Sequence, residues 1–393
     1  MRIAWSFPVR GERLDGTRGD LVRACHMVAA LRRDGHEVHV VEAAQRPASR
    51  IAVAGYRQLA RRLVPRRGAL VLRDLGRALD GRSHGVRLAR TATSCGVDLI
   101  IETQVGFAAS GAVAALRSGV PLVVDDCSPS REESALGAGL PALAAAALRR
   151  LAAAAAVVVA VCRASRDALL AEGLPEEKIC IVPNGVDVAA FERDACACVR
   201  QLTRRRLGID QGEIVVGFAG SFQPWHRVEL LVEALARLRR RHSLRVLLVG
   251  DGPGLLGVLT AARESGVEER VLALGAVLPS EIPALLGACD IGVLPGTNDY
   301  GHPMKLLEYA AAGLPSVAPD LRAVRDELIP GATGLLFPPN DASALTEALA
   351  RLVADAALRG RLGAEARSRA LRCASWEQRV QVLLDALAEK GIR

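Results

Sequence analysis

Two charged residues, Lys305 and Glu308, stand at the start of a segment with helical periodicity, Tyr300 to Gly313. Residues three apart on a helix share a face, so the ammonium and the carboxylate point into the same space. A cation beside a helix N-terminus stabilises a diphosphate, and a carboxylate there can accept hydrogen bonds from two vicinal ribose hydroxyls. An amphipathic core helix would explain Leu306 and Leu307 but not this pair. The pair predicts a nucleotide-binding helix, and Lys305 is notable because the chain has only three lysines, at 178, 305 and 390.

Two glycine-rich turns lie upstream in the same half of the chain. Gly217 to Trp225 (GFAGSFQPW) follows one apolar run and Gly250 to Gly254 (GDGPG) follows the next. Small residues let backbone N–H groups approach an anion closely. We therefore expect both turns to face a phosphate group.

The first half offers one acidic pair, Asp125 and Asp126, which closes an apolar strand. A carboxylate at the carboxyl end of a strand can orient an acceptor nucleophile. A turn-forming Asp pair is the alternative interpretation.

The elements that must position these residues alternate between short apolar runs and longer Ala/Leu/Arg segments of helical period. This rhythm predicts parallel sheets covered on both faces. The predicted strands are 1–6, 37–42, 98–102, 121–126, 156–161, 179–182, 214–218, 245–249, 271–274, 291–294 and 316–318.

The series restarts after Pro183-Asn184-Gly185, and we expect the polar stretch 188–211 to be an irregular linker. The predicted fold class is α/β, with two Rossmann-like doubly wound domains over residues 1–185 and 186–376. The last helix, in 377–393, is expected to cross back to the first domain. Ligands of such folds bind at the carboxyl ends of the strands, here in the cleft between the domains.

Composition excludes several classes. The 393 residues are half apolar, which is globular and neither disordered nor fibrous. The net charge of +8 comes almost wholly from Arg, and with only 3% aromatics no stacking surface for nucleic acid is indicated. The nine cysteines are scattered without a C-x-x-C pair, so we expect reduced thiols. The N-terminus has no apolar signal-peptide core, which leads us to expect a cytoplasmic protein.

An arginine-rich segment, Tyr56 to Arg90, holds ten Arg against Asp74 and Asp80. It is either a set of solvated helix faces in an Arg-rich chain or a basic amphipathic surface for an acidic acceptor or anionic lipid.

Common catalytic motifs are missing. The sequence has no G-x-x-x-x-G-K-[ST], no G-x-G-x-x-G after the first strand, no H-E-x-x-H and no G-x-S-x-G. This argues against P-loop kinases, most nicotinamide enzymes, zincins and α/β-hydrolases.

Strings in a fixed order carry a family resemblance over nearly the whole chain. The chain resembles the family 4 retaining glycosyltransferases of the GT-B fold, in a branch with Y-x-x-P-x-K-x-x-E-Y in place of E-x7-E. The strings are Val182 to Asp187 with Phe191, Gly217 to Ala234, Val249 to Pro253, Tyr300 to Ala318, Gly331 to Pro338 and Ser375-Trp376, with Gly19 and Gly35 to Val38 upstream.

The resemblance implies a sugar-nucleotide donor on the C-terminal domain and an acceptor on the N-terminal one. It implies catalytic roles for Lys305, Glu308, His226 and Asp126. The implied donor-binding residues are Gly220, Ser221, Arg227, Gly250, Gly252, Pro253, Tyr300, His302, Met304 and Leu306. The implied acceptor-side residues are Arg18, Gly19, Asp125 and Trp225, although Trp225 could equally be a plain packing residue.

Two positions depart from the family pattern. Tyr300 replaces the first Glu of E-x7-E, while Glu308 matches the second, which holds the donor ribose. Ser221 and His226 stand where the family has an Arg and a Lys on the diphosphate. We hypothesise that a protonated His226 and Lys305 supply the missing positive charge.

The implied activity is metal-independent, retaining transfer of a hexosyl group from a nucleotide sugar, with UDP favoured over GDP. The Asp125-Asp126 pair also resembles the metal motif of GT-A transferases, but the duplicated Rossmann rhythm argues against that fold, so no metal and no other cofactor is expected. The acceptor would be a small molecule or glycan precursor. Two alternatives stay open: a peripheral membrane transferase with a lipid-linked acceptor, which would contact anionic membrane through residues 56–90, and a GT-B phosphorylase, epimerase or non-catalytic sugar-nucleotide binder.

Overall fold

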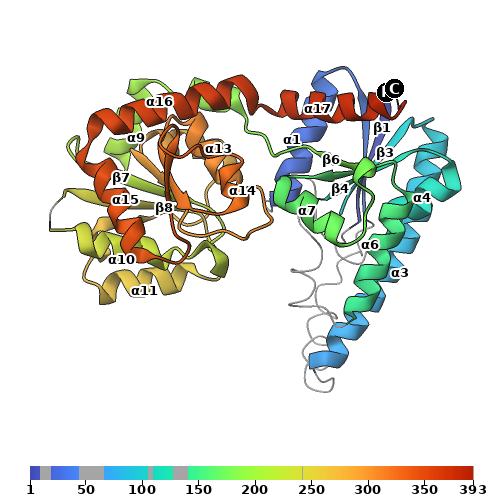
Figure 1. Cartoon of the computed structure of the whole chain (residues 1–393), viewed down its shortest axis with the longest axis horizontal. Coiled ribbons are helices and arrows are strands. Elements are labelled where there is room, and N and C mark those ends of the chain that lie inside the picture. The colour runs from blue at the N-terminus through green and yellow to red at the C-terminus, as the bar shows by residue number, and fades with distance from the viewer. Residues whose placement is uncertain (9–18, 44–65, 105–108, 127–139, 241, 393) are drawn as a thin grey trace. The chain divides into compact units, whose positions relative to one another are not determined.

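The computed structural model describes residues 1–8, 19–43, 66–104, 109–126, 140–240 and 242–392. The chain divides into two compact units, Met1–Pro183 with Arg379–Arg393, and Asn184–Gln378. The second boundary falls inside helix α17 (Trp376–Glu389). Each unit is built on one sheet with helices packed against it (Figure 1).

The first unit contains a six-stranded parallel sheet in the order β2-β1-β3-β4-β5-β6. Its central strands β3 and β4 are buried at every residue, because helices cover both faces. The strands are β1 (Arg2–Phe7), β2 (Glu37–Glu42), β3 (Leu99–Thr103), β4 (Leu122–Asp126), β5 (Val157–Ala160) and β6 (Ile179–Ile181). The helices are α1 (Gly19–Arg33), α3 (Arg66–Ser94), α4 (Ser110–Ser118), α6 (Pro141–Ala154) and α7 (Arg163–Ala171), with the 3-10 turn η1 (Glu176–Lys178).

The second unit contains a parallel sheet in the order β12-β11-β10-β7-β8-β9. The strands are β7 (Ile214–Ala219), β8 (Leu244–Val249), β9 (Val271–Ala273), β10 (Ile291–Val293), β11 (Ser316–Pro319) and β12 (Gly334–Phe337). The α-helices are α8 (Val188–Arg193), α9 (Ala197–Arg206), α10 (Glu229–Leu238), α11 (Leu255–Glu264), α12 (Ile282–Gly287), α13 (Met304–Ala311), α14 (Arg322–Arg325), α15 (Ala342–Ala354) and α16 (Ala356–Cys373). The 3-10 turns are η2 (Pro224–His226), η3 (Glu268–Arg270) and η4 (Pro279–Glu281).

Alternate residues of each strand in this sheet point into two separate cores. Val216 and Phe218 of β7 pack in the core that contains α10 and α15, whereas Val215 and Ala219 pack in the core that contains α12 and α13. Burial of both faces explains why these strands are continuous apolar runs in the sequence. The predicted fold class, two doubly wound parallel-sheet domains, is confirmed.

The predicted irregular linker at 188–211 is wrong, because most of it is helical. Asp187 caps α8 through the Ala190 N–H, and α9 follows it. Arg200 and Arg204 of α9 both pair with Asp290, just before β10. The arginines that make the stretch look polar therefore dock α9 on the second unit.

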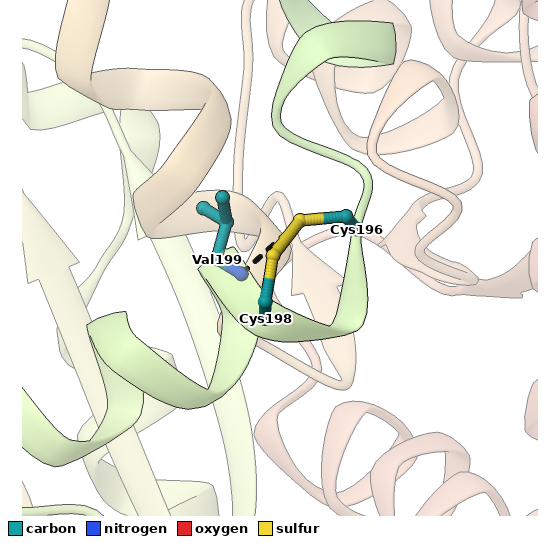
Figure 2. Close-up of a disulfide and its surroundings, with 3 residues drawn as sticks. All are labelled: Cys196, Cys198 and Val199. Carbon is teal, nitrogen blue, oxygen red and sulfur yellow. Dashed lines mark hydrogen bonds between the residues drawn. A yellow bond between two sulfur atoms is a disulfide. The ribbon is translucent and has the colours of Figure 1, made fainter.

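The expectation of reduced cysteines is also wrong at one place, because Cys196 and Cys198 form a disulfide (Figure 2). Cys196 caps α9, and its Sγ accepts a hydrogen bond from the Val199 N–H at 3.3 Å. The extended cap and the first helical turn bring the two Cα atoms to 5.4 Å, within reach of a bridge.

Much of the arginine-rich segment forms α3, a helix of 29 residues that packs on α4. Residues 56–65 of that segment lie outside the described residues. None of the helices described here combines the length and apolar composition needed to cross a bilayer.

Candidate active site

Helix α13 carries Lys305 and Glu308, and a buried tyrosine attaches it to the sheet. The Tyr309 hydroxyl donates to the Val293 carbonyl at 3.2 Å and accepts the Ala219 N–H at 3.3 Å. It therefore ties α13 to the carboxyl ends of β10 and β7. Leu306, Leu307, Tyr309 and Ala311 are buried, whereas Lys305 and Glu308 are half-buried.

The Lys305 side chain extends over the turn that follows β7. Its Nζ lies 3.1 Å from His226 Nε2 and 5.8 Å from the centre of the Phe218 ring. A Cβ atom on Gly220 would collide with the end of the Lys305 side chain. The absence of a side chain at Gly220 therefore leaves room for the Lys305 side chain. The sequence predicted a different role for Gly220, close approach of its backbone to a phosphate.

Glu308 lies nearly one turn beyond Lys305 on the same helix. Its carboxylate has no hydrogen-bond partner among the residues that the structure describes, and it is not sealed from solvent. A carboxylate in this condition can accept hydroxyl donors from a ligand.

Burial shifts the ionisation of all three groups. It raises the pKa of Glu308 to about 7, against the effect of Lys305. It lowers the pKa of Lys305 to about 8, against the effect of Glu308. Burial, followed by the Lys305 charge, lowers the pKa of His226 to about 3. The hypothesis of a protonated His226 is therefore wrong, and the ring is neutral near neutral pH.

The two glycine-rich turns lie against each other. A Cβ on Gly250 would collide with the Gly220 carbonyl, and one on Gly252 would collide with the Ser221 carbonyl. Both glycines also have left-handed φ values, +113° and +157°. They let the loop that contains Pro253 run alongside the turn after β7.

This packing uses several of the amides that were expected to face a phosphate. The Gly220 N–H donates to Val249, and the Gly250 N–H donates to Gly275. The N–H groups of Ser221 and Phe222 make no hydrogen bond within the described residues. In the turn after β7, the N–H groups that could bind a phosphate are therefore those of Ser221 and Phe222, which follow Gly220.

The remaining predicted donor residues differ in how they are held. Arg227 has a left-handed φ of 48°, and its guanidinium pairs with Glu229 and Asn340. His302 is buried and bonded to Glu327 through Nε2 at 2.8 Å, with its Nδ1 unpartnered.

At the start of α13, Tyr300 is half-buried and Met304 begins the helix. Leu306 is a core residue, and its N–H donates to Pro303, so neither its side chain nor its amide is available to a donor; that prediction is wrong. Trp225 is 41% exposed, so it is not a buried packing residue. Its ring lies edge-on to the His226 ring, beside the candidate site.

The acceptor-side predictions fall in the first unit. Arg18 lies outside the described residues, and Gly19 is the exposed first residue of α1. Asp125 and Asp126 are the last two residues of β4 and are buried, so the turn interpretation is wrong. Asp125 forms a buried ion pair with Arg23 at 2.9 Å, which gives it a structural role.

Sequence analysis missed a second polar cluster at the carboxyl edge of the first sheet. Glu102 of β3 is fully buried and accepts hydrogen bonds from Ser6 and Ser110, while its Oε1 has no partner. Ser6 in turn lies 2.9 Å from His84 Nε2. The sequence does contain a sign of this cluster, because Glu102 is a charged residue at the end of an otherwise apolar strand, LIIET.

Within the described ranges, His, Cys, Asp and Glu side chains form no group of three that could hold a metal ion. The groups near this helix that could face an anion are the Lys305 side chain and the N–H groups of Ser221 and Phe222.

Comparisons with known proteins identify the family of both halves. Residues 21–190 match "Glycosyltransferase Family 4", and residues 213–355 match "Glycosyl transferases group 1". Among curated proteins, the D-inositol 3-phosphate glycosyltransferase of Stackebrandtia nassauensis is 33% identical over 226 residues, 54% of this chain and 49% of that protein. A GDP-mannose-dependent alpha-(1-6)-phosphatidylinositol monomannoside mannosyltransferase of Mycolicibacterium smegmatis is 29% identical, over 63% of this chain and 65% of that protein. The alignment thus spans about half the length of the first of these relatives.

Solved structures match over the whole chain. The structure of Anabaena Alr3699/HepE in complex with UDP has a TM-score of 0.77 at 20% identity and covers 99% of this chain and 100% of its own. Sucrose-phosphate synthase from Thermosynechococcus elongatus has a TM-score of 0.75 at 19% identity, with 99% and 98% covered. With its two Rossmann-like sheets and the two family matches, the chain belongs to the family 4 glycosyltransferases of the GT-B fold.

Proposed function

We propose that this protein transfers a hexosyl group from a nucleotide sugar to a hydroxyl group, with retention of configuration and without a metal ion. The Lys305–Glu308 pair carries the proposal, because a lysine and a carboxylate with no hydrogen-bond partner among the described residues share one face of α13 beside the turn after β7. Glu308 would accept the ribose hydroxyls, and Lys305 would contact the diphosphate. The second unit would thus hold the donor and the first unit the acceptor.

In the proposed reaction the bond between the sugar C1 and the phosphate oxygen breaks while C1 bonds to the acceptor oxygen. The acceptor's proton passes to the departing phosphate oxygen, so the protein supplies no covalent nucleophile. Negative charge grows on the diphosphate as the bond breaks, and fixed donors stabilise it. Here these donors are Lys305, the amides of Ser221 and Phe222, and the N-terminal amides of α13.

UDP is the favoured donor nucleotide and GDP the alternative. One structural neighbour, Anabaena Alr3699/HepE, was solved both with UDP and with UDP-glucose, whereas one curated relative is named GDP-mannose-dependent. The acceptor is proposed to be a small molecule or glycan precursor.

The test is thermal stabilisation of the purified protein by UDP, GDP, ADP, CDP and dTDP, each with and without EDTA. A ligand at about 100 times its dissociation constant stabilises the folded protein by about 2.7 kcal/mol. Stabilisation by one nucleotide, unaffected by EDTA and lost in Glu308→Ala, would support the donor site and metal independence. No stabilisation by any of the five would overturn the proposal.

A lipid-linked acceptor is the second candidate, and one surface favours it. Leu72, Leu75 and Leu79 of α3 are 63%, 45% and 70% exposed. Their spacing places them on one face of the helix, and the exposed Arg82 and Arg90 continue that face. Exposed leucines beside arginines are typical of helices that lie on anionic membranes.

A further inference from the structure

Lys305 and His226 lie within hydrogen-bond distance of each other, and their protonation states decide which of the two donates. His226 is the last residue of the 3-10 turn η2, where it and Gln223 cap each other. The Gln223 N–H donates to His226 Nδ1 at 3.2 Å, and His226 Nε2 lies 3.1 Å from Lys305 Nζ. The backbone donor cannot rotate away, so the role of Nδ1 is set by the turn.

Counting donors and acceptors shows which form of the lysine this contact favours. A neutral imidazole has one N–H and one acceptor nitrogen. Since Nδ1 accepts the Gln223 N–H, the ring proton is on Nε2 and points at Lys305 Nζ. An ammonium has three donors and no lone pair, so only a neutral amine can accept this proton.

The surroundings agree with a neutral amine. The other ionisable group that acts on Lys305 is Glu308, on the same helix, and no ion pair joins the two side chains. Arg227, the neighbouring cation, is engaged by Glu229 and Asn340. The Phe218 ring lies beside the lysine and provides no acceptor. Burial lowers the pKa of Lys305 to about 8.

We infer that His226 is a positioning residue that favours the neutral amine of Lys305 in the ligand-free protein, and that above about pH 8 binding of a nucleoside diphosphate charges Lys305 with a proton taken up from solvent. Once charged, the ammonium can no longer accept from Nε2–H, and both groups become donors to phosphate oxygens. This coupling rests on the proposed donor site. It accounts for a diphosphate site in which a neutral histidine stands in place of a basic side chain.

The test uses the full-length protein with 15N-labelled lysine, because the chain has only three lysines and Lys178 and Lys390 serve as internal references. The Nζ chemical shift distinguishes amine from ammonium. Spectra are recorded from pH 6 to 11 with and without UDP, and with GDP in parallel. In the ligand-free protein we expect Lys305 to change state near pH 8, and with the nucleotide at a pH at least one unit higher.

Proton uptake is measured independently by titration calorimetry at pH 9 in two buffers of different ionisation enthalpy. At this pH the diphosphate is fully ionised and so is Glu308, whose pKa is about 7. Uptake of about 0.4 to 0.9 proton per nucleotide is expected, because free Lys305 is about nine-tenths deprotonated at a pH one unit above its pKa and bound Lys305 is between half and fully protonated.

Three variants test whether proton uptake depends on the contact between His226 and Lys305. In His226→Gln the side-chain carbonyl can accept from an ammonium, so Lys305 should already be charged in the ligand-free protein and uptake at pH 9 should fall at least twofold. His242→Gln, in the same unit but in the segment before β8, should behave like the wild type. Lys305→Met should show no uptake.

The outcomes distinguish the two proposals. Binding of UDP or GDP without proton uptake, or a Lys305 that is already charged at pH 9 in the ligand-free protein, overturns the coupling and leaves the proposed function intact. Failure of every nucleotide to bind overturns the proposed function. A neutral Lys305 at pH 9 that becomes charged on binding, in the wild type but not in His226→Gln, supports the inference.

Discussion

The Lys305 side chain occupies the space that a Cβ atom on residue 220 would fill. A glycine after β7 and a lysine 85 positions later are thus a single structural unit, held together by the packing of α13 on the sheet. This relationship leads to the first of five predictions.

Gly220→Ala should remove nucleotide binding while leaving most of the stability. The new methyl group displaces Lys305 from His226 and from the diphosphate position, because the neighbouring backbone carbonyl of Gly220 already contacts Gly250. We expect at least a tenfold loss of UDP affinity by calorimetry. Gly257→Ala in α11 is the control, since a Cβ there meets nothing within 4 Å. Equal affinity in both variants would contradict the assignment of Lys305.

Removing either charged group of α13 should slow turnover. Lys305→Ala and Glu308→Ala are each expected to cost about 2–4 kcal/mol in transition-state stabilisation, the scale of losing one preorganised donor. The measurement is kcat/KM for release of nucleoside diphosphate in the presence of acceptor. Lys390→Ala, an exposed lysine near the C-terminus, should match the wild type. Wild-type turnover in both site variants would refute their roles.

Donor affinity should be greatest in a window between pH 7 and 8. Below about pH 7 Glu308 gains a proton and loses strength as an acceptor, since its pKa is raised to about 7. Above about pH 8 a proton must be added to Lys305 at binding, so affinity falls by up to tenfold per pH unit. UDP dissociation constants from pH 5.5 to 9.5 report both limbs. In Glu308→Gln the acid limb should shrink to the part caused by protonation of the diphosphate near pH 6, and the alkaline limb should remain.

Serine at positions 72, 75 and 79 should weaken binding to anionic vesicles if the acceptor is lipid-linked. Losing three half-inserted leucines, at about 1 kcal/mol each, corresponds to roughly a hundredfold in affinity. Cosedimentation with phosphatidylglycerol vesicles measures it, and binding should fade at high salt. The control replaces Leu116, Leu202 and Leu256, which are equally exposed but scattered over α4, α9 and α11. No binding by the wild type would exclude this second candidate.

Glu102→Gln should stabilise the protein above neutral pH. Burial raises the pKa of Glu102 from 4.5 to about 7, so the folded state binds a proton that the unfolded state releases. The contribution of protonated Glu102 to the free energy of unfolding is fully present below about pH 4.5 and is lost as the pH rises through 7. The carboxylate then costs about 3 kcal/mol, and an amide removes this cost. Melting temperatures at pH 5 and pH 8 should differ less in the variant, and an unchanged difference would contradict the prediction.

Local sequence signals determined the repeated alternation of strands and helices. Apolar runs such as VLLV and LIIET predict strands buried on both faces, and all eleven predicted strands are present with no end shifted by more than one residue. The twelfth, β12 (Gly334–Phe337), was missed because four residues at a sheet edge carry little periodic signal. Helices α8 and α9, capped by Asp187 and Cys196, were missed in the predicted linker 188–211. Their sequence looked like a polar linker because Arg200 meets its partner, Asp290, only in the folded unit.

The sequence by itself determined which residue types could do the chemistry: Lys305 and Glu308 are three positions apart, and helical geometry alone places them on one face. Only the tertiary structure decided what surrounds them. His226 and Lys305 are 79 positions apart in the chain and meet only in the folded unit. Burial and the neighbouring lysine lower the pKa of His226, so the histidine is neutral where the sequence alone indicated a cation. Asp125 likewise meets its partner only in the folded unit, because Arg23 lies 102 positions away in the chain. Charge state depends on desolvation and on neighbours that are distant in the chain, and these exist only after the sheet has formed.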